Sequence, residues 1–376
     1  MISPKFFVES LGSMQMDFFT GVPDSLLKNI CAYITDHFAA DRNIIAANEG
    51  AAVGLAAGYY LATGKIPVVY MQNSGLGNTV NPLMSLTDKE VYNIPSLFLI
   101  GWRGEPGVKD EPQHIKQGKV TLPLLEAMGI KYTVLSQDEK EFLSQLSHAA
   151  SYMDETREPF AFVIQKGTFE EYKLRRNEDT ILPLKRETAI QLIASSLAND
   201  NVVVSTTGMI SRELFEYRAS VSMGHERDFL TVGSMGHASQ IALGIALEKK
   251  NRRIYCFDGD GATLMHMGSL AITGSLHPAN YVHIVFNNGA HDSVGGQPTV
   301  AFDVDLCKIA QACGYEIALS VSDSESLRET LERMKQMRGP ILLEVKVRKG
   351  AREDLGRPTT TPVQNKEAFM LFLDSE

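Results

Sequence analysis

Residues 253–288 read RIYCFDGDGATLMHMGSLAITGSLHPANYVHIVFNN, and this stretch indicates the fold class. Two short apolar runs, at 254–257 and 282–286, are rich in β-branched and aromatic residues and predict buried strands. The segment between them has a helical pattern. The stretch therefore predicts a strand, a helix and a second strand, which is the repeating unit of a parallel α/β sheet.

Polar residues follow both predicted strands: DGDGA at 258–262 and NN at 287–288. Open α/β sheets bind ligands at the carboxyl ends of their strands, because helix N-termini and free backbone amides converge there. Glycines let the backbone approach a diphosphate closely, and carboxylate and amide oxygens are hard ligands that suit Mg²⁺. The stretch therefore predicts a site that binds a diphosphate and a metal ion together.

The order of these elements resembles the cofactor-anchoring motif of the thiamine-diphosphate enzymes. Here 25 residues separate GDG at 259–261 from NN at 287–288. A surface turn would explain GDG alone, but it would not explain strand, GDG, helix, strand and NN in this order. The resemblance implies thiamine diphosphate and Mg²⁺ as cofactors. It implies three metal ligands, which are Asp260, Asn288 and the backbone oxygen of Ala290, and it adds Gly261 and Ala262 to the cofactor site.

The segment 229–236 (FLTVGSMG) precedes a further helical pattern. It resembles the family segment in which a large apolar side chain supports the cofactor from below, and Met235 takes that place. The resemblance implies that the backbone of Gly233 accepts a hydrogen bond from the amino group of the cofactor. It also implies diphosphate contacts from Thr207 and Gly208. Without these neighbours, Met235 would be read as an ordinary core residue.

The first half of the chain contains a candidate catalytic acid. The run IIAA at 44–47 leads into Glu49 and then into a helical pattern of small residues at 51–62. This segment, like FFTGVPDSLL at 18–27, resembles the pyrimidine-binding domain of the family, whose catalytic Glu stands at such a strand-to-helix turn. The resemblance implies that Glu49 activates the cofactor. The plain alternative is a first-turn acid stabilised by the helix dipole.

Strand and helix patterns alternate through both halves of the chain. The expected strands are 44–47, 67–72, 96–102, 131–135 and 160–165 in the first half, and 202–205, 254–257, 282–286 and 341–347 in the second. A charged stretch, EEYKLRRNED at 170–179, separates the halves. We expect an α/β protein of two tandem doubly wound parallel-sheet domains of the thiamine-diphosphate-binding type, without a middle domain. The expected parts are a pyrimidine-binding domain (1–175), a linker (176–188) and a diphosphate-binding domain (189–376).

Four further stretches, at 72–83, 102–114, 287–299 and 350–362, resemble family members that decarboxylate small 2-keto acids. Their substrates carry a tetrahedral anion on C3, either a phosphonate or a sulfonate, and both remain open here. Such an anion calls for fixed cations, although any single one is more often a solvated surface charge. The candidates are Arg103, Lys109, Lys116, Arg352 and Arg357. The proton donor or acceptor is predicted to be His114, with Asp110, His291 and Asp292 as alternatives.

The composition excludes several classes of protein. A formal net charge of -9 and a pI near 5.6 argue against broad nucleic-acid binding. Four cysteines without a CxxC pair give little support to disulfides or zinc, and no apolar stretch is long enough for a membrane span. We expect a cytoplasmic protein with no nucleic-acid or membrane partner. The resemblance implies a homodimer or larger homo-oligomer that binds a small 2-keto acid.

Two functions of other kinds remain open. A non-catalytic protein that binds thiamine diphosphate would keep GDG and NN without needing the acid, and the presence of Glu49 argues against it. A nicotinamide-binding protein is the weaker alternative, because no GxGxxG follows an early strand.

Overall fold

The computed structural model describes residues 1–175 and 182–375. The chain divides into two compact units: unit 1 is Met1–Asn177 with Val294–Gln297, and unit 2 is Glu178–Ser293 with Pro298–Glu376. Residues 176–181 of the expected linker lie outside the described residues. The last three residues of the expected linker (176–188) are helical, because helix α7 (Arg186–Ser196) begins at Arg186.

Unit 1 contains a six-stranded sheet in which every neighbouring pair is parallel. The strand order is β2 (Asn43–Ile45), β1 (Phe19–Gly21), β3 (Val68–Gln72), β4 (Leu97–Gly101), β6 (Phe160–Ile164) and β5 (Lys131–Val134). One face packs against α1 (Pro4–Ser13), α2 (Lys28–His37) and α6 (Glu139–Thr156). The other packs against α3 (Glu49–Thr63), α4 (Leu76–Pro82) and α5 (Pro112–Ala127).

Unit 2 contains a second all-parallel, six-stranded sheet. Its order is β11 (Ile317–Val321), β12 (Ile341–Lys346), β10 (Tyr281–Asn287), β9 (Ile254–Gly259), β7 (Val202–Ser205) and β8 (Asp228–Leu230). One face packs against α7, α8 (Met209–Ser220) and α13 (Ser324–Met334). The other packs against α9 (Ala238–Glu248), α11 (Gly268–Leu276), α12 (Leu306–Ala312) and α14 (Pro362–Asp374). The short helix α10 (Asp260–Met265) follows β9 directly.

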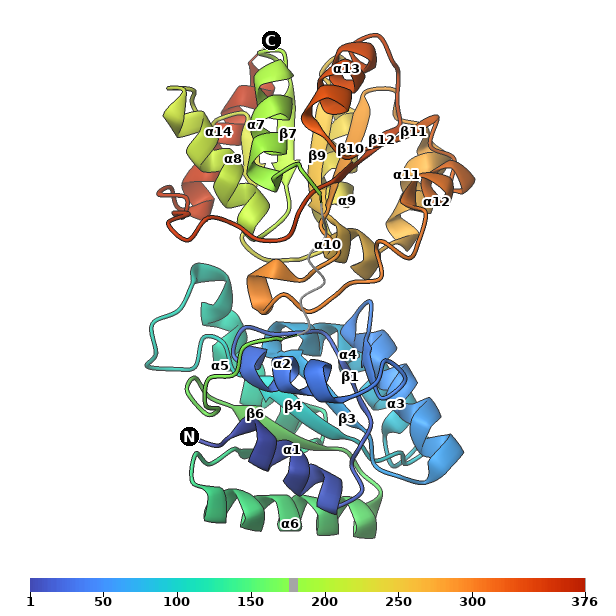
Figure 1. Cartoon of the computed structure of the whole chain (residues 1–376), viewed down its shortest axis with the longest axis vertical. Helices are drawn as coiled ribbons and strands as arrows, with labels where there is room; N and C mark the ends of the chain where they lie inside the picture. Colours follow the sequence, from blue (N-terminus) through green and yellow to red (C-terminus); the bar gives the residue numbers. More distant parts are fainter. Residues whose placement is uncertain (176–181, 376) are drawn as a thin grey trace. The chain divides into compact units, whose positions relative to one another are not determined.

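Alternate residues of each inner strand enter different cores. In β4, Leu97 and Leu99 belong to the cluster on one face, and Phe98 and Ile100 belong to the cluster on the other. This is the period-two pattern of a strand buried on both sides. Figure 1 shows helices packed along both sheets.

Both sheets have the same topology. If the strands of each unit are numbered from one, both orders read 2-1-3-4-6-5. The prediction of two tandem doubly wound parallel-sheet domains is confirmed. In each sheet the order reverses between the first and third strands, which creates a switch point of the kind where such folds bind ligands.

The predicted strands agree with the observed ones to within two residues at each end. Three strands were not among the expected ones: β1 in unit 1, and the edge strands β8 and β11 in unit 2. Strands β1 and β8 have only three residues each, and most of β11 is not buried. In the sequence a helical pattern is clear only at 121–127 (TLPLLEA), whereas α5 begins at Pro112. Its polar first turns and Gly118 obscured the pattern, and Gly118 is needed where the helix backbone meets the carbonyl of Gly104.

Among the described residues, no helix is both long and apolar enough to cross a membrane.

Candidate active site

The predicted metal ligands follow two adjacent strands of unit 2. Strands β9 and β10 pair in parallel with Phe286 opposite Gly259, so the chain leaves both strands at the same edge of the sheet. Asp260 is the first residue of α10, and Asn288 directly follows β10. Both side chains are buried, with exposed fractions of 3% and 5%. A carboxylate and an amide therefore lie at one sheet edge, largely shielded from water.

Burial shapes the charge of Asp260. Desolvation raises the pKa of this carboxyl to about 6, while hydrogen bonds from the Thr299 hydroxyl and from backbone amides act in the opposite direction. The negative charge of Asp292 adds to the upward shift of this pKa. A buried carboxylate beside a second one is unfavourable unless a cation compensates for it. These groups therefore fit a bound metal ion.

A tight turn connects Asn288 to Ala290. The Oδ1 atom of Asn288 accepts a hydrogen bond from the Ala290 amide at 3.0 Å, and its Nδ2 donates to Asp292 at 2.7 Å. Between them, Gly289 has φ +66°, and a Cβ atom there would collide with the ring of Phe302. Glycine is therefore required where the chain turns around the metal-ligand candidates.

Three more predicted cofactor residues lie beside this turn. A Cβ atom on Gly261 would stand 2.9 Å from the ring of His291 and 3.4 Å from the terminal methyl of Met235. The Met235 side chain therefore lies against the GDG motif, although Met235 precedes Asp260 by 25 residues in the sequence. Ala262 is buried in the first turns of α10.

The remaining predicted contacts lie after β7 and β8, on the other side of the switch point. Thr207 and Gly208 follow β7, and Gly208, with φ +99°, is the N-cap of the twelve-residue helix α8. Gly233 and Met235 lie in the turn between β8 and α9. Because β7 pairs with β9, the start of α8 and the GDG motif follow adjacent strands.

Burial also affects His291, which the sequence offered only as an alternative proton donor. Desolvation lowers its pKa to about 4, against the opposing charge of Asp292. The ring is therefore neutral near pH 7. The ring of His291 lies against Gly261 of the predicted cofactor site, and the sequence alone gave no indication of this contact.

Glu49 lies in unit 1, at the first position of α3, and its side chain is only 5% exposed. Its Oε2 atom accepts a hydrogen bond from Asn78 Nδ2 at 2.7 Å. Gly75 makes room for the carboxyl group, because a Cβ atom at that position would collide with it. Within the described part of the chain, Oε1 has no hydrogen-bond partner. The carboxyl group is thus held on one side and available on the other.

Arg103, after β4, forms a forked ion pair with Asp110 through Nε at 2.8 Å and Nη2 at 2.5 Å, and donates through Nη1 to Ser25. Burial opposes ionisation of Asp110, but these bonds and two backbone amides lower its pKa. His114 lies nearby in the first turn of α5 and is buried. Burial, assisted by the charge of Arg103, lowers the pKa of His114. Its Nδ1 atom has no hydrogen-bond partner among the described residues.

The predicted substrate cations are divided between the units. Arg103, Lys109 and Lys116 are in unit 1, whereas Arg352 and Arg357 follow β12 in unit 2. Lys109, Lys116 and Arg357 are exposed. Arg352 forms ion pairs with three carboxylates: Glu187, Glu216 and Asp354. Arg103 and Arg352 therefore have acidic partners already.

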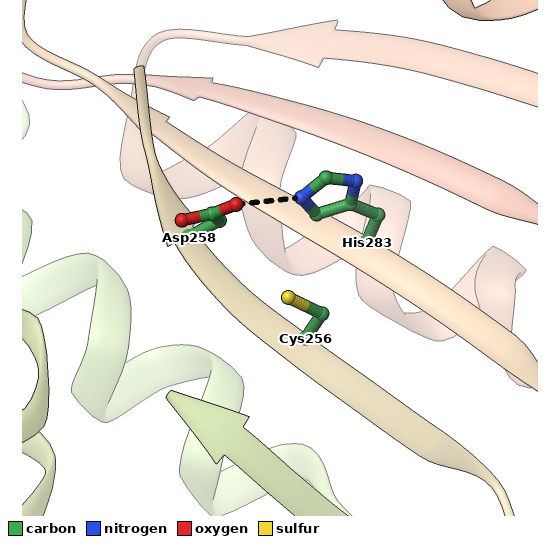
Figure 2. Close-up of side chains that lie close together, drawn as sticks. All are labelled: Cys256, Asp258 and His283. Carbon is green, nitrogen blue, oxygen red and sulfur yellow. Dashed lines mark hydrogen bonds and ion pairs between the residues drawn. The ribbon is translucent and has the colours of Figure 1, made fainter. Parts of the chain in front are cut away.

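A second cluster of metal-binding residue types lies deeper in unit 2. Cys256 and Asp258 on β9 and His283 on β10 are buried, and their ligand atoms lie within 4.8 Å of one another (Figure 2). His283 bonds Asp258 at 3.3 Å through Nε2 and the Tyr315 hydroxyl at 3.5 Å through Nδ1. The other oxygen of Asp258 accepts a backbone amide. Because these polar groups satisfy one another, we interpret the cluster as a brace for the end of β9.

Two family models match this chain. Residues 4–135 match the thiamine pyrophosphate enzyme N-terminal TPP binding domain, and residues 206–345 match the C-terminal TPP binding domain of the same enzymes. Thiamine pyrophosphate is another name for thiamine diphosphate. The chain belongs to the thiamine pyrophosphate enzyme family.

Individual relatives extend the similarity over the whole chain. A phosphonopyruvate decarboxylase of Streptomyces viridochromogenes is 33% identical, over 99% of this chain and 95% of that protein. A sulfopyruvate decarboxylase of Methanosarcina acetivorans is 30% identical, over 88% of this chain and 87% of that protein. A sulfopyruvate decarboxylase subunit beta of Methanococcus maripaludis is 32% identical, over 47% of this chain and 92% of that protein.

The Asp260→Ala variant should lose metal-dependent binding of thiamine diphosphate. Changing a residue that only supports a metal ligand typically costs 10–100-fold in affinity, so loss of the carboxylate itself should cost more than about 100-fold. Calorimetric titration with thiamine diphosphate and Mg²⁺ measures the change. Asp303→Ala, at an exposed aspartate of the same unit, is the matched control and should bind normally. Unchanged binding in Asp260→Ala would contradict the metal-site prediction.

Proposed function

We propose that this protein decarboxylates 3-phosphonopyruvate to phosphonoacetaldehyde and CO₂, using thiamine diphosphate and Mg²⁺. The observation that carries the proposal is the edge of β9 and β10, where the buried Asp260 and Asn288 follow two adjacent parallel strands, which supports their role as metal ligands. The choice of substrate is supported by the full-length similarity to a protein named phosphonopyruvate decarboxylase.

In this proposal, residues 1–175 act as the pyrimidine-binding domain and 189–376 as the diphosphate-binding domain. The family-model matches to an N-terminal and a C-terminal TPP binding domain support this division. The enzyme is further proposed to act in the cytoplasm, since the described residues contain no helix suited to a membrane.

Asp260, Asn288 and the backbone oxygen of Ala290 would hold Mg²⁺. The hard oxygen donors and the elevated pKa of Asp260 support this role, because a metal ion would compensate the buried charge. The diphosphate would then bind at the backbone of Gly261 and Ala262 and at two residues near the start of α8, which are Thr207 and Gly208.

Thiamine diphosphate, when bound, supplies the electron sink for the electron pair released as CO₂ leaves. Glu49 would hold a proton at N1′ of the aminopyrimidine, and its available Oε1 supports this role. The backbone of Gly233 would accept a hydrogen bond from the 4′-amino group, and Met235 would support the bent shape of the cofactor. The contact between Met235 and the GDG motif supports its placement at the cofactor.

His114 is proposed to act as the proton donor or acceptor for the substrate. Its lowered pKa and its Nδ1 atom without a partner among the described residues support a neutral ring that is ready to accept a proton. Four cations are proposed to bind the phosphonate: Arg103, Lys109, Arg352 and Arg357. For Arg103 and Arg352, the phosphonate would have to share the guanidinium with carboxylates already bound to it.

The second candidate function is decarboxylation of sulfopyruvate, which the similarity to a sulfopyruvate decarboxylase favours. A phosphonate carries up to two negative charges and a sulfonate carries one, so the number of fixed cations at the site would decide between them. Sequence and geometry leave both anions chemically acceptable.

A homodimer or larger homo-oligomer is proposed, in which Glu49 of one chain meets Asp260 and Met235 of another. The relative named as a subunit, which matches less than half of this chain, supports assembly from more than one chain in that protein. Helix α3 supports an interface here, because Leu61 is 72% exposed and Gly54 and Gly58 have open space around them. An apolar face with small residues permits close approach of another chain.

Turnover of three substrates, measured side by side, tests the proposed activity. We expect CO₂ release from 3-phosphonopyruvate to have the largest kcat/KM, with sulfopyruvate lower and pyruvate lowest, because the phosphonate carries the most negative charge for several cations to bind and pyruvate has no anion on C3. Each reaction is run with and without thiamine diphosphate and Mg²⁺ as controls. A larger kcat/KM for sulfopyruvate would replace the proposed substrate, and no turnover of any would refute the activity.

The Glu49→Gln variant should bind thiamine diphosphate but lose turnover. The amide cannot transfer a proton to N1′, and loss of such acid–base help typically lowers rates by about 10²–10⁴-fold. Hydrogen–deuterium exchange at C2 of the bound cofactor, followed by NMR, measures activation directly. Glu139→Gln, at an exposed glutamate in unit 1, is the control. Exchange at the normal rate in Glu49→Gln would show that another group activates the cofactor.

Mixing two inactive variants tests the shared site. If Glu49 and Asp260 of one site come from different chains, co-expressed Glu49→Gln and Asp260→Ala chains will form some sites with both residues intact. In each mixed dimer one of the two sites should then be intact, so the purified mixed dimers should regain about half of the wild-type activity. Differently tagged chains, purified on both tags, supply the mixed oligomers. Absence of activity in such oligomers, or an active monomer by light scattering, would rule out the model.

A further inference from the structure

The amide of Asn288 has a fixed orientation, and a neighbouring carboxylate sets it. Its Nδ2 atom donates to Asp292 Oδ2 at 2.7 Å. An ionised carboxylate can only accept hydrogen bonds, so the amide must turn its NH₂ group toward Asp292. The oxygen Oδ1 consequently faces the opposite way, toward the turn at Ala290. Oxygen is also the only atom of this amide that can bind a metal ion.

Asp292 is itself held by several donors. Besides Asn288, its Oδ2 atom accepts from Arg186 Nη1 at 3.0 Å and from the backbone amide of Gly350 at 2.9 Å. Three donors from three separate segments thus converge on one oxygen. They fix the position of the carboxylate.

Arg186 is locked from the other side. It is 5% exposed, and its Nε and Nη2 atoms donate to the two oxygens of the buried Glu213 on α8, at 2.9 and 3.0 Å. Burial alone would lower the pKa of Arg186, but Glu213 and Asp292 outweigh it and raise this pKa. The guanidinium is planar, so the fork to Glu213 determines where Nη1 points.

The charges of this chain of contacts do not cancel. Glu213 and Asp292 carry two negative charges and Arg186 carries one positive charge, which leaves one negative charge. The carboxylate of Asp260, at the start of α10, adds a second one. A divalent cation would balance the two.

We propose that Arg186, held by Glu213, and Asp292 form a positioning relay that keeps Asn288 Oδ1 directed at the metal ion and so sets the affinity for divalent cations. The inference rests on the proposed function, because it assumes that Asn288 is a metal ligand. Neither Arg186 nor Asp292 is proposed to touch the metal; both act through the amide. A purely structural role, bracing α7 and α8, is the simpler alternative.

The Asp292→Asn variant separates the two roles. An asparagine offers an NH₂ group as well as an oxygen, so position 292 no longer forces the orientation of the Asn288 amide, and only the hydrogen bond from the Ala290 amide still favours it. We expect Mn²⁺, titrated by electron paramagnetic resonance in the presence of thiamine diphosphate, to bind about 10–100-fold more weakly. Unchanged Mn²⁺ affinity would overturn the inference.

A double-mutant cycle makes the test specific. In an Asn288→Asp background both side-chain oxygens can bind metal, so the ligand needs no orienting, and adding Asp292→Asn should cost less than about threefold in Mn²⁺ affinity. A structural brace would lose the same affinity in both backgrounds. The same 10–100-fold loss in both would therefore refute the positioning role.

Two controls keep the outcome clear. The wild-type protein must bind Mn²⁺ in the presence of thiamine diphosphate. If it does not, both the proposed function and the inference are refuted. If it does, but the variants bind Mn²⁺ as tightly as the wild type, only the inference is refuted. If Asp292→Asn does not fold, Glu213→Gln loosens Arg186 without touching Asp292, and it should weaken Mn²⁺ binding in the same direction. Unfolding midpoints without metal are measured for every variant. Normal Mn²⁺ affinity in a folded Glu213→Gln protein would contradict the relay.

Discussion

The parallel pairing of β9 and β10 is the interaction on which the site in unit 2 depends. Its register sets Phe286 opposite Gly259, and the chain therefore leaves the two strands at the same edge of the sheet, just before Asp260 and Asn288. A shift of the β9–β10 register by two residues would move these side chains apart by about 7 Å. A shift by one residue would place every side chain of β10 on the opposite face of the sheet. Because β10 is buried along its whole length, its apolar residues make either slip costly.

That edge concentrates buried polar groups, and each must find a partner. Asp258 bonds His283, Asp260 accepts from Thr299, and Asp292 collects donors from Arg186 and elsewhere. Only one of these carboxylates has a guanidinium, so the edge carries excess negative charge. A divalent ion suits that excess, whereas a diphosphate suits the N-terminus of α8 beside it. Adjacent loops of one sheet thus provide negative charge for the metal ion and a helix N-terminus for the diphosphate.

The fold and the motif residues were predictable because the signal is local. Apolar runs mark the inner strands, and GDG and NN directly follow two of them. Contacts between distant segments left no such signal: Asp292 meets Arg186 across 106 residues, and Arg352 meets Glu187 across 165. Arg352 was predicted to bind the substrate because two of its acidic partners, Glu187 and Glu216, lie on distant helices whose exposed faces have the pattern of an ordinary amphipathic surface. The edge strands β8 and β11 were not predicted for a related reason. Their burial depends on the segments that pack against them and not on the hydrophobic pattern of their own residues.

The shared order of the two sheets explains how one scaffold provides two kinds of site. In each unit the second strand leads into a helix of small residues, α3 in unit 1 and α9 in unit 2. The residue at that turn is Glu49 in the first unit, whereas the second unit has Met235. At the end of the third strand, unit 2 has the GDG motif, whereas unit 1 has Gln72 and Asn73, which bond the side chains of Asp24 and Thr121. The strands fix where loops converge, and the loop residues alone decide whether that place binds a metal ion or holds a proton.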